Sequence, residues 1–174
     1  MEIESLIKSK VRDVRDYPKE GIVFKDITPL LKDGKAFSAC VDAFADLIKG
    51  RNIDAIAGIE ARGFLVGSAL SYRTGIGFVP IRKKGKLPAD VISTSYSLEY
   101  GEAAMEMHKD AIRRGDDVLI VDDVLATGGS ASAAVSLVNQ LHGNVAALAF
   151  LIELGFLNGR KLLQGHEIIS LARY

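Results

Sequence analysis

The segment from residue 118 to residue 130 combines residue types that can bind a phosphorylated sugar. An apolar run over 118–121 is followed by two carboxylates, Asp122 and Asp123, and then by a loop of small residues that opens a helix. The loop residues are Ala126, Thr127, Gly128, Gly129 and Ser130. Small residues let backbone amides approach an anion, and the helix N-terminus adds partial positive charge.

The two carboxylates extend this interpretation to a ribose 5-phosphate. Carboxylates suit vicinal hydroxyls or a divalent cation beside the phosphate. Because neighbouring strand residues point to opposite faces, we expect different roles for Asp122 and Asp123 unless the backbone turns between them. Thr-Gly-Gly alone also fits an ordinary turn between a strand and a helix. The apolar strand and the aspartate pair favour the phosphate site.

Two further polar clusters follow apolar runs of the chain. Glu60, Ala61 and Arg62 come directly after the run at 55–59, and a basic cluster follows the run at 77–81. The basic residues are Arg82, Lys83, Lys84 and Lys86. Such a run is usually a solvated surface. Because the basic cluster follows a strand and the chain as a whole is electrically neutral, the alternative interpretation is that the cluster binds a polyphosphate.

The elements expected around these clusters alternate between strands and helices. Strands are expected at 55–59, 77–81, 118–121, 145–154 and 168–171, and helices at 2–10, 33–49, 63–72, 129–141 and 161–163. Residues 22–31 are broken by Pro29 and are expected to be extended or irregular, and 91–106 to be a hairpin or a mobile arm. This β-α-β order predicts an open, mostly parallel α/β sheet whose ligands bind at the carboxyl ends of the strands.

Length and composition fit one domain over residues 1–174. The chain is 48% hydrophobic, and its 22 basic and 22 acidic residues cancel, which argues against a general nucleic-acid binder. A lone cysteine, Cys40, excludes an internal disulfide, and no apolar run is long enough to span a bilayer. The acidic N-terminus lacks a signal-peptide pattern. We therefore expect a cytoplasmic protein without membrane partners.

Five segments together resemble a known enzyme family. Residues 121–130 are similar to the motif with which type I phosphoribosyltransferases bind phosphoribosyl diphosphate (PRPP). Segments 17–31, 58–64, 82–88 and 96–101 resemble, in the same order, signatures of the adenine phosphoribosyltransferases. The resemblance implies a type I fold with a small N-terminal hood over about 1–33 and a mobile lid. It also implies a Mg²⁺-dependent reaction of adenine and PRPP to AMP and pyrophosphate.

The resemblance further implies a role for each cluster in binding PRPP. Backbone groups of residues 126–130 would hold the 5-phosphate, while Asp122 and Asp123 would contact the ribose hydroxyls. The positions expected at the pyrophosphate are Glu60, Ala61, Arg62, Arg82, Lys83, Lys86 and Tyr100. Many relatives carry serine at position 61, and the basic cluster often comes from a neighbouring subunit, which implies a homodimer. Mg²⁺ would be held mainly by PRPP and water, with no direct protein ligand assigned.

Base recognition and proton transfer are also implied by the resemblance. Val23, Phe24 and Lys25 match the adenine-binding positions, where backbone groups would read the base edge and Phe24 would stack on the ring. Glu99, in a lid at 95–101, is expected to handle the proton at the adenine imidazole ring, with Arg62 as the second catalytic residue. Without the resemblance, Phe24 fits a core position and Glu99 an exposed loop carboxylate.

Two other functions stay open at this point. One is a phosphoribosyltransferase for another purine base, against which segment 17–31 argues. The other is a non-catalytic regulator that senses PRPP. Such regulators usually carry an added DNA-binding module, and this chain has no spare length for one.

Overall fold

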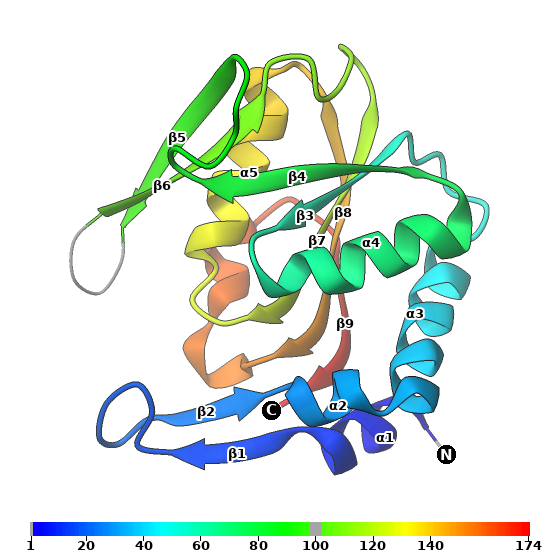
Figure 1. Cartoon of the computed structure of the whole chain (residues 1–174), viewed down its shortest axis with the longest axis vertical. Helices are drawn as coiled ribbons and strands as arrows, with labels where there is room; N and C mark the ends of the chain where they lie inside the picture. The colour runs from blue at the N-terminus through cyan, green and yellow to red at the C-terminus, as the bar shows by residue number, and fades with distance from the viewer. Residues whose placement is uncertain (1, 98–101) are drawn as a thin grey trace.

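A seven-stranded sheet with strand order β5-β6-β4-β3-β7-β8-β9 forms the centre of the molecule (Figure 1). The computed structural model describes residues 2–97 and 102–174. The parallel strands are β3 (Ala55–Ile59), β4 (Gly77–Lys83), β7 (Asp117–Leu125), β8 (Asn144–Glu153) and β9 (Ile168–Arg173). At one edge β6 (Glu102–His108) pairs antiparallel with β4 and with β5 (Val91–Ser97). The expected open, mostly parallel sheet is confirmed.

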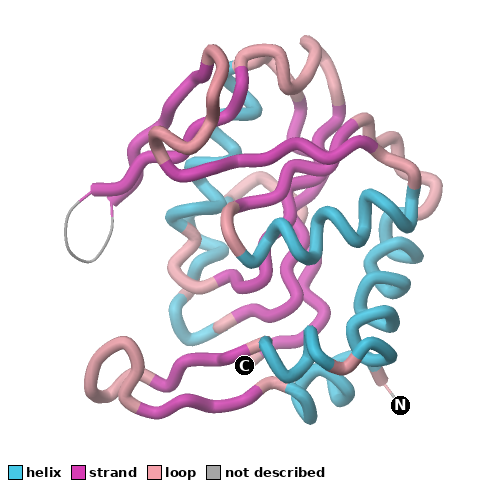
Figure 2. The backbone as a smooth tube through the Cα atoms, in the orientation of Figure 1, coloured by secondary structure: helices cyan, strands magenta, loops and turns pink. Residues whose placement is uncertain are grey.

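Helices cover both faces of the sheet (Figure 2). One face packs against α1 (Ile3–Lys10), α2 (Thr28–Lys32), α3 (Gly34–Ile48) and α4 (Arg62–Thr74), and the other against α5 (Gly129–Gln140). In β7, Leu119 and Val121 face the first group of helices, whereas Val118 and Ile120 face α5. Burial on both faces explains why the strand is a continuous apolar run without alternation.

A two-stranded antiparallel sheet, β1 (Arg12–Arg15) with β2 (Val23–Asp26), lies beside the main sheet (Figure 1). No strand was expected at β1, and residues 22–31 are not simply extended or irregular, because α2 follows β2 directly. Pro29 lies in the first turn of α2. A proline is compatible with that position because the first backbone N–H groups of a helix have no partner within it.

The other helices and strands lie where the sequence predicts them, but their first and last residues differ from the predicted bounds. Asp33 caps α3 by accepting a hydrogen bond from the backbone N–H of Ala36 (3.1 Å), as predicted. Of the two alternatives for 91–106, the hairpin is confirmed by the antiparallel pairing of β5 with β6. Residues 98–101 lie outside the described chain. Two short 3₁₀ helices, Gly155–Leu157 and Gly159–Leu163, replace the single piece expected at 161–163. Among the described residues, no helix is both long and apolar enough to cross a membrane.

Asp26 fixes the junction between β2 and α2. Its carboxylate accepts hydrogen bonds from the backbone N–H (2.9 Å) and hydroxyl (2.7 Å) of Thr28 and pairs with Arg12. The hydrogen bonds from Thr28 and then Arg12 lower the pKa of Asp26 to about 2. Because the folded state thus favours the charged form, the stabilisation is present above the pKa of an unfolded aspartate and is lost as the pH falls towards 2.

We expect Asp26→Asn to lower the free energy of unfolding by about 1–2 kcal/mol at pH 7, since the charged acceptor is lost. Urea unfolding at a series of pH values measures the effect. The difference between the variant and the wild type should shrink as the pH falls from about 5 towards 2. A difference that does not depend on pH would contradict the assigned role of the Asp26 charge.

Candidate active site

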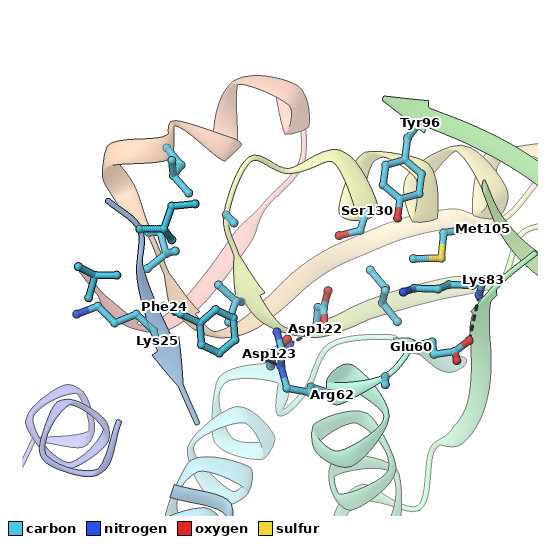
Figure 3. Close-up of a pocket in the computed structure, with 18 residues that line it drawn as sticks. Phe24, Lys25, Glu60, Arg62, Lys83, Tyr96, Met105, Asp122, Asp123 and Ser130 are labelled. Atoms are coloured by element: carbon cyan, nitrogen blue, oxygen red, sulfur yellow. Dashed lines mark hydrogen bonds and ion pairs between the residues drawn. The ribbon is translucent and has the colours of Figure 1, made fainter. Parts of the chain in front are cut away.

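A cavity of about 520 Å³ opens at the carboxyl ends of β3 and β7 and is closed on one side by β2 (Figure 3). Of the residues expected to bind a ligand, it is lined by Val23, Phe24, Lys25, Glu60, Ala61, Arg62, Lys83, Asp122, Asp123, Ala126 and Ser130. These residues come from four separate stretches of the chain. The fold therefore brings together most of the positions that the sequence singled out.

The other expected positions lie beside the cavity or outside the described chain. Thr127, Gly128 and Gly129 fill the loop between two lining residues, Ala126 and Ser130. The cavity is not lined by three members of the basic cluster, Arg82, Lys84 and Lys86. Glu99 and Tyr100 lie outside the described residues.

Asp122 and Asp123 lie within β7 rather than after it, because the strand continues to Leu125. Asp123 forms an ion pair with Arg62, which lies at the N-terminus of α4. The carboxylate of Asp122 accepts a hydrogen bond from the backbone N–H of Asp123 (2.8 Å). Burial, followed by the neighbouring charge of Asp123, raises the pKa of Asp122 well above that of an ordinary aspartate. As the alternation of a strand predicts, the two carboxylates have different partners.

Arg62 lies between two parts of the cavity. Burial works against its charge, but the ion pair with Asp123 outweighs this and raises the pKa of Arg62. The Cζ atom of Arg62 lies 5.5 Å from the centre of the Phe24 ring, and Tyr17 contacts the same ring edge-to-face at 5.3 Å between centroids. The guanidinium group therefore connects the wall formed by β2 with the carboxylate of β7.

Lys25 lines the cavity, but its side-chain charge is paired with a carboxylate elsewhere. Its Nζ atom lies 2.6 Å from a carboxylate oxygen of Asp13 and 4.2 Å from the centre of the Tyr174 ring. In Figure 3 the ammonium group points away from Phe24 and Asp122. Among the described residues, β2 pairs with β1 alone, so the backbone donors and acceptors along its other edge are not used in a sheet.

Glu60 ties the loop after β3 to the basic cluster after β4. It accepts hydrogen bonds from Arg82 (Nε, 3.2 Å) and from the backbone N–H of Lys83 (3.0 Å), and the Glu60–Ala61 peptide is cis. Burial opposes the charge of Glu60, but the bonds from Arg82 and Lys83 lower its pKa. Arg82 is thus engaged in an ion pair with Glu60. The ammonium group of Lys83 points into the cavity (Figure 3) and has no ion-pair partner among the described residues.

The loop that leads into α5 provides backbone N–H groups at the cavity. Gly128 has a φ of 86°, a left-handed conformation that suits glycine, and it precedes the first residue of α5. No side chain caps this helix. The first N–H groups of a helix lack partners within it, so this end of α5 can bind an anion.

Several lining residues are not among the positions that the sequence analysis assigned to a ligand. They are Ile22, Ile59, Tyr96, Met105, Val124, Leu154 and Leu157. The hydroxyl group of Tyr96 points into the cavity (Figure 3). Burial, and then the charge of Asp122, raises the pKa of Tyr96, which keeps the phenol protonated as a donor. Tyr96 lies at the start of the matched segment 96–101, whereas Met105 reaches the cavity through strand pairing and had no sequence signal.

A metal ion would find few protein ligands here. In residues 2–97 and 102–174, no group of three His, Cys, Asp or Glu side chains is placed to hold one. Asp123 is already paired with Arg62, so the carboxylates do not form a cation cage. This arrangement fits a Mg²⁺ ion whose oxygen ligands come mainly from a substrate and water.

Comparison with known proteins identifies relatives over nearly the whole chain. Residues 27–161 match the model of the phosphoribosyl transferase domain. The adenine phosphoribosyltransferase of Thermotoga neapolitana is 52% identical over 168 residues, which cover 97% of this chain and 99% of the relative.

Solved structures agree with the sequence relatives. The crystal structure of adenine phosphoribosyltransferase from Thermoanaerobacter pseudethanolicus superposes with a TM-score of 0.95 at 53% identity and covers 99% of both chains. The enzyme from Saccharomyces cerevisiae, solved with adenine and an imino-altritol bisphosphate, has a TM-score of 0.92 at 40% identity, covering 97% of this chain and 98% of that one.

Proposed function

The chain belongs to the adenine phosphoribosyltransferase family, and we propose that the cavity between β2, β3 and β7 converts adenine and PRPP to AMP and pyrophosphate. The observation that carries this proposal is the juxtaposition of three kinds of group in one cavity. These are the N-terminal loop of α5, the buried aspartate pair and the cations Arg62 and Lys83. Together they match the phosphate, diol and pyrophosphate of a single molecule of PRPP.

PRPP would lie across the cavity from α5 to the loop after β3. We assign its 5-phosphate to residues 126–130, and its ribose hydroxyls to Asp122 and Asp123. Its pyrophosphate would meet Ala61, Arg62 and Lys83, since a cation can bind phosphate oxygens by charge-assisted hydrogen bonds. Arg82 and Glu60 would support this loop through their ion pair rather than touch the pyrophosphate.

Adenine would bind against the hood over about 1–33, next to Phe24. Free donors and acceptors at the edge of β2 suit the N1 and 6-amino groups of adenine, and the Phe24 ring offers a stacking surface. A 6-oxo purine would leave buried polar groups unpaired, at a cost of about 1–3 kcal/mol per group. The side-chain charge of Lys25 has no part in this contact because Asp13 holds it.

The reaction breaks the bond between ribose C1 and the pyrophosphate oxygen and forms a bond from C1 to adenine N9. Positive charge develops on the ribose ring and negative charge on the leaving pyrophosphate, so Asp122 and Asp123 would stabilise the ring while Arg62 and Lys83 stabilise the leaving group. Glu99, which lies outside the described residues, is assigned the proton of the imidazole ring of adenine. Mg²⁺ bound through PRPP and water would neutralise charge on the pyrophosphate.

A homodimer in the cytoplasm is part of the proposal. Leu65 and Tyr72 lie two helical turns apart on one face of α4 and are 48% and 93% exposed. Large apolar side chains in the open favour a protein contact at this face. Helix α4 begins at Arg62, which lines the cavity. A partner subunit that docked on this face of α4 would therefore lie close to the cavity. A single cysteine, buried and free, fits a reducing compartment.

The direct test supplies the protein with PRPP, Mg²⁺ and one base at a time and follows nucleotide and pyrophosphate. We expect AMP from adenine and little product from hypoxanthine, guanine or xanthine, because the hood pairs only with a 6-amino purine. A different preferred base would keep the chemistry and refute the assignment of Val23, Phe24 and Lys25. PRPP binding without product from any base would favour a PRPP-sensing regulator.

A further inference from the structure

The chain segment 154–160, which follows β8, forms part of two regions of the cavity at once. Leu154 and Leu157 line the same cavity as Phe24, the residue against which adenine is proposed to bind. Gly159 lies against the loop assigned to the 5-phosphate. One short segment without long helices or strands therefore supports the binding regions of both proposed substrates.

The contact between Gly159 and the phosphate loop is made by backbone alone. A Cβ atom on Gly128 would lie 2.6 Å from the carbonyl oxygen of Gly159, and a Cβ on Gly159 would overlap the carbonyl oxygen of Ala126. The backbone at Gly128 and the backbone at Gly159 are too close for a side chain on either residue. Any shift of Gly159 is therefore transmitted to the loop directly.

An ion pair between the buried Glu153 and the half-exposed Arg160 closes the segment at both ends. Glu153, the last residue of β8, is 3% exposed and accepts two hydrogen bonds from Arg160, from Nε at 2.8 Å and from Nη2 at 2.7 Å. The hydroxyl of Ser170 in β9 donates a third bond to Glu153 at 2.8 Å. These bonds, first of all those from Arg160, lower the pKa of Glu153 despite its burial, so it is charged at neutral pH. The planar guanidinium fixes the direction as well as the distance of the contact.

We infer that Glu153 and Arg160 are positioning residues that hold segment 154–160 as a common wall for PRPP and adenine. The inference rests on the proposed function. Neither side chain lines the cavity, so neither is expected to touch a substrate or take part in bond breaking. Loosening the pair should therefore weaken the binding of both substrates together and leave the chemical step nearly unchanged.

The test is Arg160→Lys, which keeps the positive charge and removes the planar, two-pronged contact. We expect the KM values for PRPP and adenine to rise together by roughly tenfold, with kcat within about twofold of the wild type, because a wall displaced by a fraction of an ångström misplaces both substrates. The matched control is Arg51→Lys. Arg51 makes the same kind of contact with Glu167, at 2.6 and 2.8 Å, but lies away from the cavity. Both KM values should stay unchanged in the control.

Amide hydrogen exchange in residues 126–130 provides a second readout that does not need turnover. Exchange there should be faster in Arg160→Lys than in the wild type and in Arg51→Lys. If Arg160→Lys does not fold, Ser170→Ala removes one hydrogen bond from Glu153 and should shift the same quantities in the same direction. Unchanged KM values, or unchanged exchange in a folded variant, would overturn the inference. If the wild type forms no nucleotide from any base, the proposed function fails. The exchange measurement alone then tests whether Glu153 and Arg160 hold segment 154–160 against the phosphate loop.

Discussion

Replacing Arg62 with alanine should lower kcat/KM for PRPP by roughly 10²–10³-fold, the loss that follows removal of one well-placed charged donor in a transition state. Arg62 is the cation that connects the wall of Phe24 with the buried carboxylate of Asp123. Without it, Asp123 stays buried without its partner and the leaving pyrophosphate loses a donor. Steady-state kinetics in both substrates measures the effect.

A second arginine on the same helix is the natural control for Arg62→Ala. Arg73 pairs with Asp42 at 2.7 Å, and both side chains are more than half exposed. Arg73→Ala should leave kcat/KM unchanged, since an exposed ion pair contributes little. Equal losses of kcat/KM in the two variants would indicate a general effect on α4. An unchanged kcat/KM in Arg62→Ala would contradict the assignment of Arg62 to the active site.

Gly63→Ala should nearly abolish activity and also destabilise the protein. A Cβ atom at residue 63 would lie 2.8 Å from the carbonyl oxygen of Val121 and 2.9 Å from a carboxylate oxygen of Asp122. Helix propensity alone predicts the opposite sign, because alanine is favoured over glycine by about 1 kcal/mol inside a helix. Overpacking costs about 1–3 kcal/mol, and here the obstacle includes backbone that cannot rotate away.

We expect the first turn of α4 to move away from β7, which separates Arg62 from Asp123 and lowers kcat/KM by about 100-fold for a shift near 1 Å. Thermal unfolding and kinetics measure the two effects separately. Gly77→Ala is the control, since residue 77 is exposed and its Cβ would meet nothing within 4 Å. A Gly63→Ala variant as stable and active as the wild type would show that α4 and β7 can separate without harm.

The parts of the fold that could be predicted are those whose signal is local. The continuous apolar runs of β3 and β7 and the Asp33 cap of α3 each lie within a few residues. The start of α2 is not predicted by the sequence, because Pro29 interrupts the apolar run, although a proline suits a first helical turn. β1 was missed because Arg12–Arg15 is mostly charged and packs at the surface beside β2, so no apolar pattern marks it.

The same distinction applies to the cavity. Its loops could be recognised because each is a compact stretch of polar or small residues after an apolar run. Met105 could not, because it reaches the cavity only through the antiparallel pairing of β6 with β4, where it lies opposite Lys83. The ion pair of Arg62 with Asp123 joins residues 61 positions apart, and no local pattern encodes such a partner.

The order of the strands also determines when activity can appear as the chain folds. β7 lies beside β3, although α4, β4 and the β5–β6 hairpin intervene in the sequence. Contacts between distant parts of a chain require long loops to close and form slowly. Helical signal can therefore recover early during refolding, whereas the meeting of Arg62 with Asp123 must wait for β3 and β7 to pair. Recovery of enzyme activity would then report the time at which β3 and β7 pair.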